Sequence, residues 1–249
     1  MRRPLEHNIF LSSKKEEISI SKHFIVLIGN YGSGKTELSL NFALKAAGEG
    51  KRCVLADLDI VNPYFRSSEQ NALLESHSIR LISPPYARTN VDVPVLSAEV
   101  NRVFVEDYDL VIFDVGGDSV GATALGQYYH QFETVRSEVE ALYVVNTRRP
   151  LAGTAEDIVL MFDQIQLCSR MPITGFINNS NLAGETTAEQ LIEGEEVLRE
   201  VTARTGVPVR YISGKQHILL DLEVKTHNMH LSEKFFPIDI YTRPQWLDL

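Results

Sequence analysis

The sequence predicts a three-layer α/β fold in which a mainly parallel, twisted sheet lies between two layers of helices. Short, continuous apolar runs alternate with longer amphipathic stretches along the chain. Strands that are apolar throughout are typical of parallel sheets covered on both faces, and the amphipathic stretches fit the helices between them. Hydrophobic residues make up 44% of the 249 residues and charged residues 23%, which suits one large globular domain.

The strands are marked by apolar runs of four to six residues, and Gly, Pro, Asp, Asn or Ser follows each run within two positions. Such residues end a strand because they favour turns over extended backbone. The expected strands, in order, are residues 24–28, 53–56, 79–82, 110–113, 141–145, 173–177 and 207–212.

The helices are placed by start signals and by apolar residues three or four positions apart. Pro94 fits the first turn of one helix, and Ile158 and Phe162 begin the apolar face of another. Thr186 and Glu189 have the spacing of a capping box. The expected helices, in order, are residues 35–48, a short one from 67, 94–104, a glycine-interrupted one at 122–132, 154–168 and 186–204.

No change of composition marks a linker, so residues 1–249 are expected to form one domain with an N-terminal extension, 1–21, and a C-terminal extension, 216–249. The net charge of −9 disfavours nucleic acid or an anionic membrane as the main partner. Neither a signal peptide nor a membrane span is recognisable, and Cys53 and Cys168 stand apart as expected for unpaired thiols. We expect a cytoplasmic protein.

A glycine-rich loop joins the first strand to the first helix, with the sequence Gly29-Asn30-Tyr31-Gly32-Ser33-Gly34-Lys35-Thr36. In this context the pattern G-x-x-x-x-G-K-[ST] predicts a nucleoside-triphosphate site, because backbone N–H groups and a helix N-terminus point at one anion. We expect Lys35 to reach the β- and γ-phosphates and Thr36 to ligate Mg²⁺. Glu37, the next residue of the helix, is counted among the nucleotide-binding residues.

Three carboxylates follow two of the expected strands. Asp114 follows strand 110–113 and fits a Mg²⁺ ligand, and the N–H of Gly117 is placed to sense the γ-phosphate. Asp57 and Asp59 both leave the second strand on the same side if the backbone stays extended. We expect Asp57 to hold the water shell of Mg²⁺ and Asp59, which stands further into the loop, to orient the attacking water.

The polar clusters should meet, because ligands of parallel sheets bind beyond the carboxyl ends of the strands. Each cluster directly follows an apolar run. The clusters are residues 29–36, 57–66, 114–118, 146–149, 178–181 and 213–215.

The loop at 29–36, Asp57-Leu58-Asp59, Asp114-Val115-Gly116-Gly117 and the strand end at Asn178 resemble the MinD/ParA-type ATPases of the SIMIBI class of P-loop proteins. The resemblance covers about residues 22–215. It implies an ATP-driven, Mg²⁺-dependent switch that hydrolyses ATP and acts on a partner protein, unidentified here. It further implies catalytic roles for Lys35 and Asp59 and a contact between adenine and Asn178; the neighbouring Asn179 is counted with it.

The chain departs from this family at the second position of the loop. Members usually carry there a lysine that reaches the nucleotide of a partner subunit, whereas this chain has Asn30. A homodimer is therefore expected to be independent of nucleotide, or to use Arg66, Arg148 or Arg149 in place of the lysine.

The expected base is adenine, because 178–181 lacks the carboxylate that takes the guanine N–H groups in the Asn-Lys-x-Asp motif. Two alternatives remain at this point. One is an ATP-dependent small-molecule kinase or amide ligase with an acceptor pocket around Tyr86 and Arg88. The other is a module that binds ATP without hydrolysing it and presents Tyr64-Phe65-Arg66 to a partner.

Overall fold

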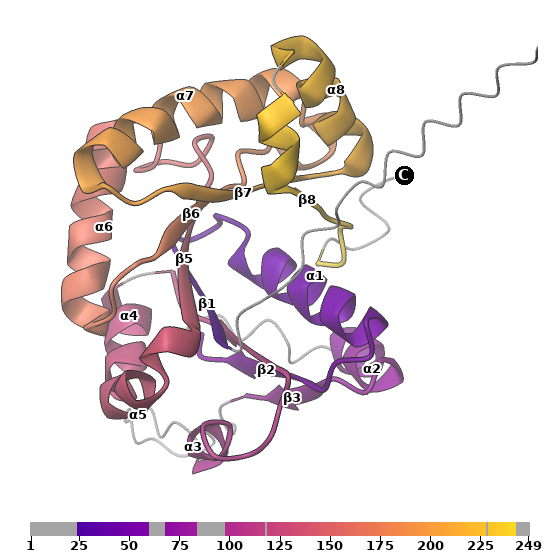
Figure 1. Ribbon diagram of the computed structural model, residues 1–249, viewed down its shortest axis with the longest axis vertical. Coiled ribbons are helices and arrows are strands. Elements are labelled where there is room, and N and C mark those ends of the chain that lie inside the picture. The colour runs from indigo at the N-terminus through magenta and orange to yellow at the C-terminus, as the bar shows by residue number, and fades with distance from the viewer. Residues whose placement is uncertain (1–23, 60–67, 84–97, 118, 228, 243–249) are drawn as a thin grey trace, which may run out of the picture.

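One eight-stranded sheet runs through the protein in the computed structural model, which describes residues 24–59, 68–83, 98–117, 119–227 and 229–242 (Figure 1). The strand order is β3-β2-β4-β1-β5-β6-β7-β8, and all seven pairings are parallel. The prediction of a mainly parallel sheet is confirmed. The strands are β1 Phe24–Ile28, β2 Cys53–Asp57, β3 Arg80–Ile82, β4 Leu110–Asp114, β5 Val139–Val145, β6 Gly175–Asn178, β7 Val209–Gly214 and β8 Phe235–Pro237.

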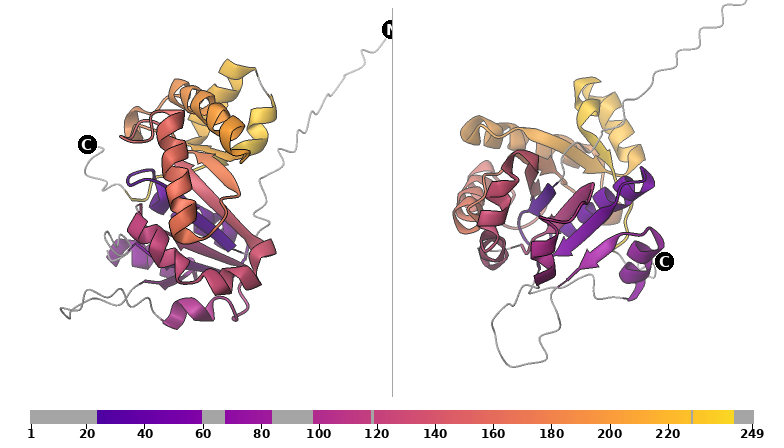
Figure 2. Two further views of the ribbon diagram at one scale, coloured as in Figure 1. Left: turned by 90° about the vertical axis from the view of Figure 1, so that its left-hand side faces the viewer. Right: turned by 60° about the horizontal axis from the view of Figure 1, so that its bottom comes forward.

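Helices cover both faces of the sheet (Figures 1 and 2). The side chains of α1 and α2 pack on one face, those of α3 to α7 pack on the other, and α8 packs on α7 beside β7. The helices are α1 Lys35–Gly48, α2 Ser68–Ser76, α3 Ala98–Arg102, α4 Ser119–Gly126, α5 Tyr129–Thr134, α6 Ala155–Ser169, α7 Ala188–Thr205 and α8 Gln216–Thr226.

The central strand β1 shows why the apolar runs are continuous. Phe24 and Val26 contact the core under α4 to α7, whereas Ile25 and Leu27 contact the core under α1. Successive side chains of a strand point to opposite faces, so a strand covered on both sides is apolar at every position.

Three details of the predicted helices were wrong. The segment 122–132 forms two helices, α4 and α5, which meet between Gly126 and Tyr129. The capping box of α7 lies one residue later than predicted: the N-cap is Thr187, and its N–H donates to the Gln190 side chain at 2.8 Å. The described part of the third helix, α3, ends at Arg102 rather than Phe104.

The C-terminal part is built into the sheet rather than appended to it. After α8 and a 3₁₀ segment, Met229–Lys234, the chain adds β8 beside β7, a strand that the sequence did not predict. None of the described helices is long and apolar enough to cross a membrane.

Candidate functional site

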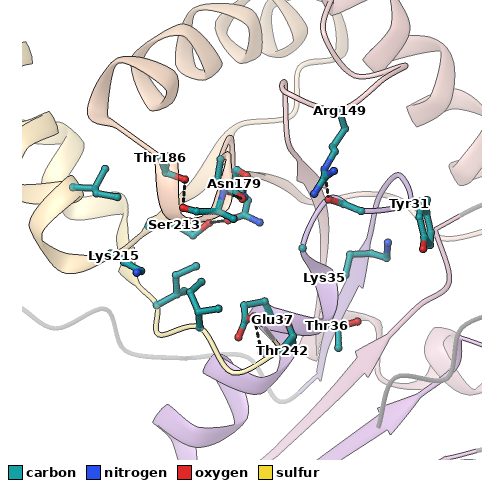
Figure 3. A pocket seen from close by; sticks show the side chains of 18 of the residues that line it. Tyr31, Lys35, Thr36, Glu37, Arg149, Asn179, Thr186, Ser213, Lys215 and Thr242 are labelled. Carbon is teal, nitrogen blue, oxygen red and sulfur yellow. Dashed lines mark hydrogen bonds between the residues drawn. The ribbon is translucent and has the colours of Figure 1, made fainter. Parts of the chain in front are cut away.

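A cavity of about 620 Å³ opens at the carboxyl ends of the strands (Figure 3). Its lining comes from the glycine loop, the first turn of α1, the loops after β2, β5, β6 and β7, and the segment after β8. The volume is within the range of small-ligand sites. The prediction that polar clusters 29–36, 146–149, 178–181 and 213–215 meet at one edge is confirmed by this lining.

The glycine loop needs its glycines where the backbone is crowded. Gly29 has a φ of +151°, and a Cβ atom there would lie 2.3 Å from the Val144 carbonyl oxygen. Gly34 has a φ of +95°, and a Cβ there would lie 2.2 Å from the Asn179 amide nitrogen. Since L-residues avoid this part of φ space, the loop takes its course only with glycine at both positions.

Lys35 is buried at the first position of α1, and its ammonium group is held above the loop. The Nζ atom donates to the carbonyl oxygens of Gly29, at 3.1 Å, and Asn30, at 3.0 Å. The side chain also lines the cavity. A positive charge fixed this way beside open space is suited to an anionic ligand.

Thr36 and Asp114 meet directly below the loop. The Thr36 hydroxyl donates to Asp114 Oδ2 at 2.7 Å, and Asp114 is 1% exposed. Burial raises the pKa of Asp114 to about 6, although the charge of Lys35 and the bond from Thr36 act in the opposite direction. A carboxylate whose charge is costly here gains from a cation placed beside it.

Asp57 and Asp59 have different positions relative to the cavity. Asp57 lies opposite Asp114 in the β2–β4 register, is 1% exposed, and its Oδ1 accepts the backbone N–H of Asp59 at 2.9 Å. Asp59, unlike Asp57, lines the cavity. Asp57 therefore shapes the turn that presents Asp59, and a direct role of Asp57 at a metal stays a prediction.

The oxygen atoms of Thr36 and Asp114 fit Mg²⁺, which favours oxygen ligands and usually binds one or two carboxylates together with substrate phosphates. Within the described ranges no three His, Cys, Asp or Glu side chains gather into a metal site made by protein alone. A magnesium ion would be held jointly by these two residues and a bound triphosphate.

Asn178 and Asn179 point in different directions, and the predicted contact of Asn178 with the base is wrong in this structure. The Asn178 amide is fully buried and donates to Leu191 O and Glu195 Oε1 of α7, both at 2.9 Å. Asn179 lines the cavity. Its Nδ2 donates to Ser33 O at 2.7 Å, so it clamps the glycine loop.

Comparisons with known proteins found distant relatives. The signal recognition particle protein of Rickettsia conorii is 22% identical over 218 residues, which cover 86% of this chain and 44% of that protein. Its Rickettsia prowazekii counterpart is 23% identical over 199 residues, 80% of this chain and 40% of that protein. The chain thus spans less than half the length of these relatives. No protein-family model matches it.

Solved structures match over most of the chain. The cell division protein FtsY of Thermotoga maritima aligns with a TM-score of 0.52 and 18% identity over 89% of this chain and 67% of its own. FlhF complexed with GMPPNP and Mg²⁺ aligns with a TM-score of 0.51 and 18% identity over 80% of this chain and 68% of its own. The chain has the P-loop NTPase fold.

The second residue of the P-loop faces the protein interior. Asn30 Nδ2 donates to Leu151 O at 3.0 Å, and the Tyr143 hydroxyl donates to Asn30 Oδ1 at 3.1 Å. Asn30 therefore holds the loop to β5 and to the segment that follows it. Gly117 packs beneath the same loop, because a Cβ there would lie 2.6 Å from Tyr31 N.

The arginines after β5 have separate places. Arg149 lines the cavity, and its Nε donates to the P-loop carbonyl of Gly32 at 3.0 Å (Figure 3). Arg148 is paired with Glu193 of α7. Arg66, residues 64–65, Tyr86 and Arg88 lie outside the described residues.

The C-terminal side of the cavity was not predicted. Ile238, Ile240 and Thr242 line it, and Glu37 binds this segment: its Oε1 accepts Tyr241 N at 2.7 Å. Burial raises the pKa of Glu37. An alternation of apolar residues from Phe236 to Ile240 is the sequence signal that would have revealed a half-buried extended segment.

Proposed function

We propose that this chain is a Mg²⁺-dependent nucleoside-triphosphate hydrolase that works as a nucleotide-controlled switch. The observation that carries the proposal is the contact between Thr36 and Asp114, 2.7 Å long and placed beside the buried Lys35 under the P-loop. Lys35 and Thr36 line the cavity, and Asp114 lies directly behind Thr36. An ammonium group, a hydroxyl and a carboxylate placed this way suit a metal-bound triphosphate and few other ligands.

The residues then have distinct tasks. Thr36 and Asp114 hold Mg²⁺, which supplies positive charge to the phosphate oxygens when it is bound. The Lys35 ammonium group, which donates to the carbonyl oxygens of Gly29 and Asn30 in this structure, donates instead to oxygens of the β- and γ-phosphates when nucleotide is bound. Asp59, presented by Asp57 at the edge of the cavity, orients the attacking water and takes up its proton.

The base at the far end of the cavity is proposed to be guanine. The FlhF structure with GMPPNP supports GTP. ATP, expected from the sequence, is the second candidate and has one observation in its favour. Asn181 stands where guanine sites place a carboxylate, and its amide is engaged with Asn179 O at 2.7 Å and Ala183 N at 3.2 Å.

A protein partner is proposed as well. The relatives' names are those of a particle component and of a cell division protein, which supports a switch that acts within an assembly. Arg149 and the exposed Tyr31 lie at the mouth of the cavity, where a partner would sense the bound nucleotide.

The test is hydrolysis by the purified chain with Mg-GTP and Mg-ATP, with the co-purified nucleotide identified by mass spectrometry. We expect turnover that needs Mg²⁺ and is lost on substitution of Asp59. Binding of neither triphosphate by the folded protein would contradict the proposal, and turnover of ATP alone would reverse the choice of base.

A further inference from the structure

The segment that follows β8, residues 238–242, forms one wall of the nucleotide cavity. Ile238, Ile240 and Thr242 line the cavity, whereas Asp239 and Tyr241, between them, bond to α1. The alternation is that of an extended chain. We call this segment the C-terminal wall.

Asn41, in the second turn of α1, holds the middle of the C-terminal wall. Its Nδ2 donates to Asp239 O at 2.9 Å, and its Oδ1 accepts Asp239 N at 2.9 Å. Asn41 is 8% exposed. In a sheet, a neighbouring strand would supply the hydrogen-bond partners of these backbone groups. Here the Asn41 side-chain amide supplies them, so the N–H and the C=O of Asp239 are both hydrogen-bonded.

Glu37, one turn earlier on the same face of α1, holds the end of the wall. Its carboxylate accepts three bonds, from Tyr241 N at 2.7 Å, Thr242 N at 3.1 Å and Thr242 Oγ1 at 2.5 Å. The backbone of the wall is thus tied to the helix that carries Lys35 and Thr36.

Three isoleucine side chains line the cavity beside the wall and the first turn of α8. Ile238 and Ile240 face it from the wall, and Ile218 faces it from α8. In Figure 3, Lys35 and Thr36 lie across the cavity from Ser213 and Lys215, and Thr242, the last residue of the wall, lies beside Thr36. Apolar side chains suit the flat face of a nucleobase, so a triphosphate on Lys35 would direct its base toward the wall.

We propose that Asn41 and Glu37 are positioning residues that hold the C-terminal wall against the base of the bound nucleotide. The proposal rests on the proposed function of the site. It makes α1 the common support of both ends of the ligand: the first residues of the helix serve the phosphates, and the next turn fixes the wall.

The experiment compares Mg-GTP, Mg-ATP and Mg-tripolyphosphate in calorimetric titrations of the full chain. Asn41→Leu leaves Asp239 N–H and C=O without their partners, and we expect about tenfold weaker binding of the nucleotide that the wild type prefers. Ile240→Ala removes side-chain surface from the wall directly, and a loss of similar size, about tenfold, is expected. Tripolyphosphate has no base, so its affinity should be unchanged in both variants.

Thr174→Val is the matched control, because the Thr174 hydroxyl makes a similar reciprocal pair with Ala141 N, at 3.0 Å, and Ala141 O, at 3.1 Å, away from the site. It should bind all three ligands as the wild type does. Glu37→Gln keeps an acceptor oxygen for Tyr241 N and should retain more nucleotide affinity than Glu37→Ala.

Unchanged nucleotide affinity of folded Asn41→Leu, or equal losses of nucleotide and tripolyphosphate, would overturn the positioning role. If Asn41→Leu does not fold, full nucleotide affinity of Ile240→Ala overturns it in the same way. A wild-type chain that binds neither nucleotides nor tripolyphosphate refutes the proposed function instead, so the two failures are distinguishable.

Discussion

Substitution of Asp114 by Asn should stabilise the nucleotide-free protein while it abolishes Mg²⁺-dependent binding. Asp114 is 1% exposed and accepts the Thr36 hydroxyl at 2.7 Å. An amide has nearly the same shape and keeps an acceptor oxygen, but it carries no charge into the protein interior. The substitution therefore removes a desolvation cost and, with it, the ligand for a cation.

The size of the gain follows from the pKa of Asp114, which burial raises from 3.8 to about 6. Such a difference corresponds to about 3 kcal/mol of unfolding free energy. Between pH 3.8 and about 6 the folded protein keeps a proton that the unfolded chain releases, so this contribution to stability falls as the pH rises through that window. The Asn variant has no ionisable group at this position, so this pH-dependent contribution to its free energy of unfolding is absent.

Urea unfolding of both proteins at several pH values between 4.5 and 7.5 measures the effect. We expect the variant's advantage to be small at the acid end and to approach about 3 kcal/mol above pH 6. Mg-nucleotide should then raise the stability of the wild type and not that of the variant. An advantage independent of pH, or a variant less stable than the wild type at pH 7.5, would refute the reasoning.

Three further outcomes are expected. Lys35→Ala should lose tight Mg-nucleotide binding in calorimetry and remain folded by circular dichroism, because it leaves the triphosphate charge uncompensated; undiminished affinity would contradict the site. Asp59→Asn should bind nucleotide normally and hydrolyse it at least about a hundredfold more slowly in a phosphate-release assay. Light scattering of Asp59→Asn should show no doubling of mass on addition of Mg-nucleotide, since Asn30 is turned inward; a doubling that survives Arg149→Ala would show that this argument fails.

The centre of the sheet was predictable from sequence because its strands are covered on both faces. Residues 24–28 are all apolar and are followed by Gly29. Residues 110–113 are also apolar, and Asp114 ends their strand. The edge strand Phe235–Pro237 has three residues and ends in proline. The strand alone is too short to show a period, and the alternation is visible only when residues 238–240 are included. The place of the strand beside β7 depends on contacts that local sequence does not record.

The glycine loop was predictable for a different reason. The spacing of the glycines, Lys35 and Thr36 is set by the shape of a triphosphate, so the same local pattern carries the same geometry. No such local rule applies to the residues at the proposed base position. Asn178 and Asn179 are adjacent, and an extended chain turns their side chains to opposite sides. Only the packing of Gly194 and Glu195 of α7 on β6 decides that Asn178 faces α7 and Asn179 faces the cavity. Glu37 finds its partners near the other end of the chain.

The strand order has a consequence for how the chain is completed during translation. The central strand β1 lies between β4 and β5. Its hydrogen bonds to these two strands can therefore form only after residues 110–114 and 139–145 have left the ribosome. The C-terminal wall, residues 238–242, emerges almost a hundred residues later still. A nascent chain with five strands assembled therefore has the glycine loop, Lys35, Thr36 and Asp114 but not the C-terminal wall. Under the role proposed for the wall, the contact with the base is gained only after nearly all of the described chain has been made.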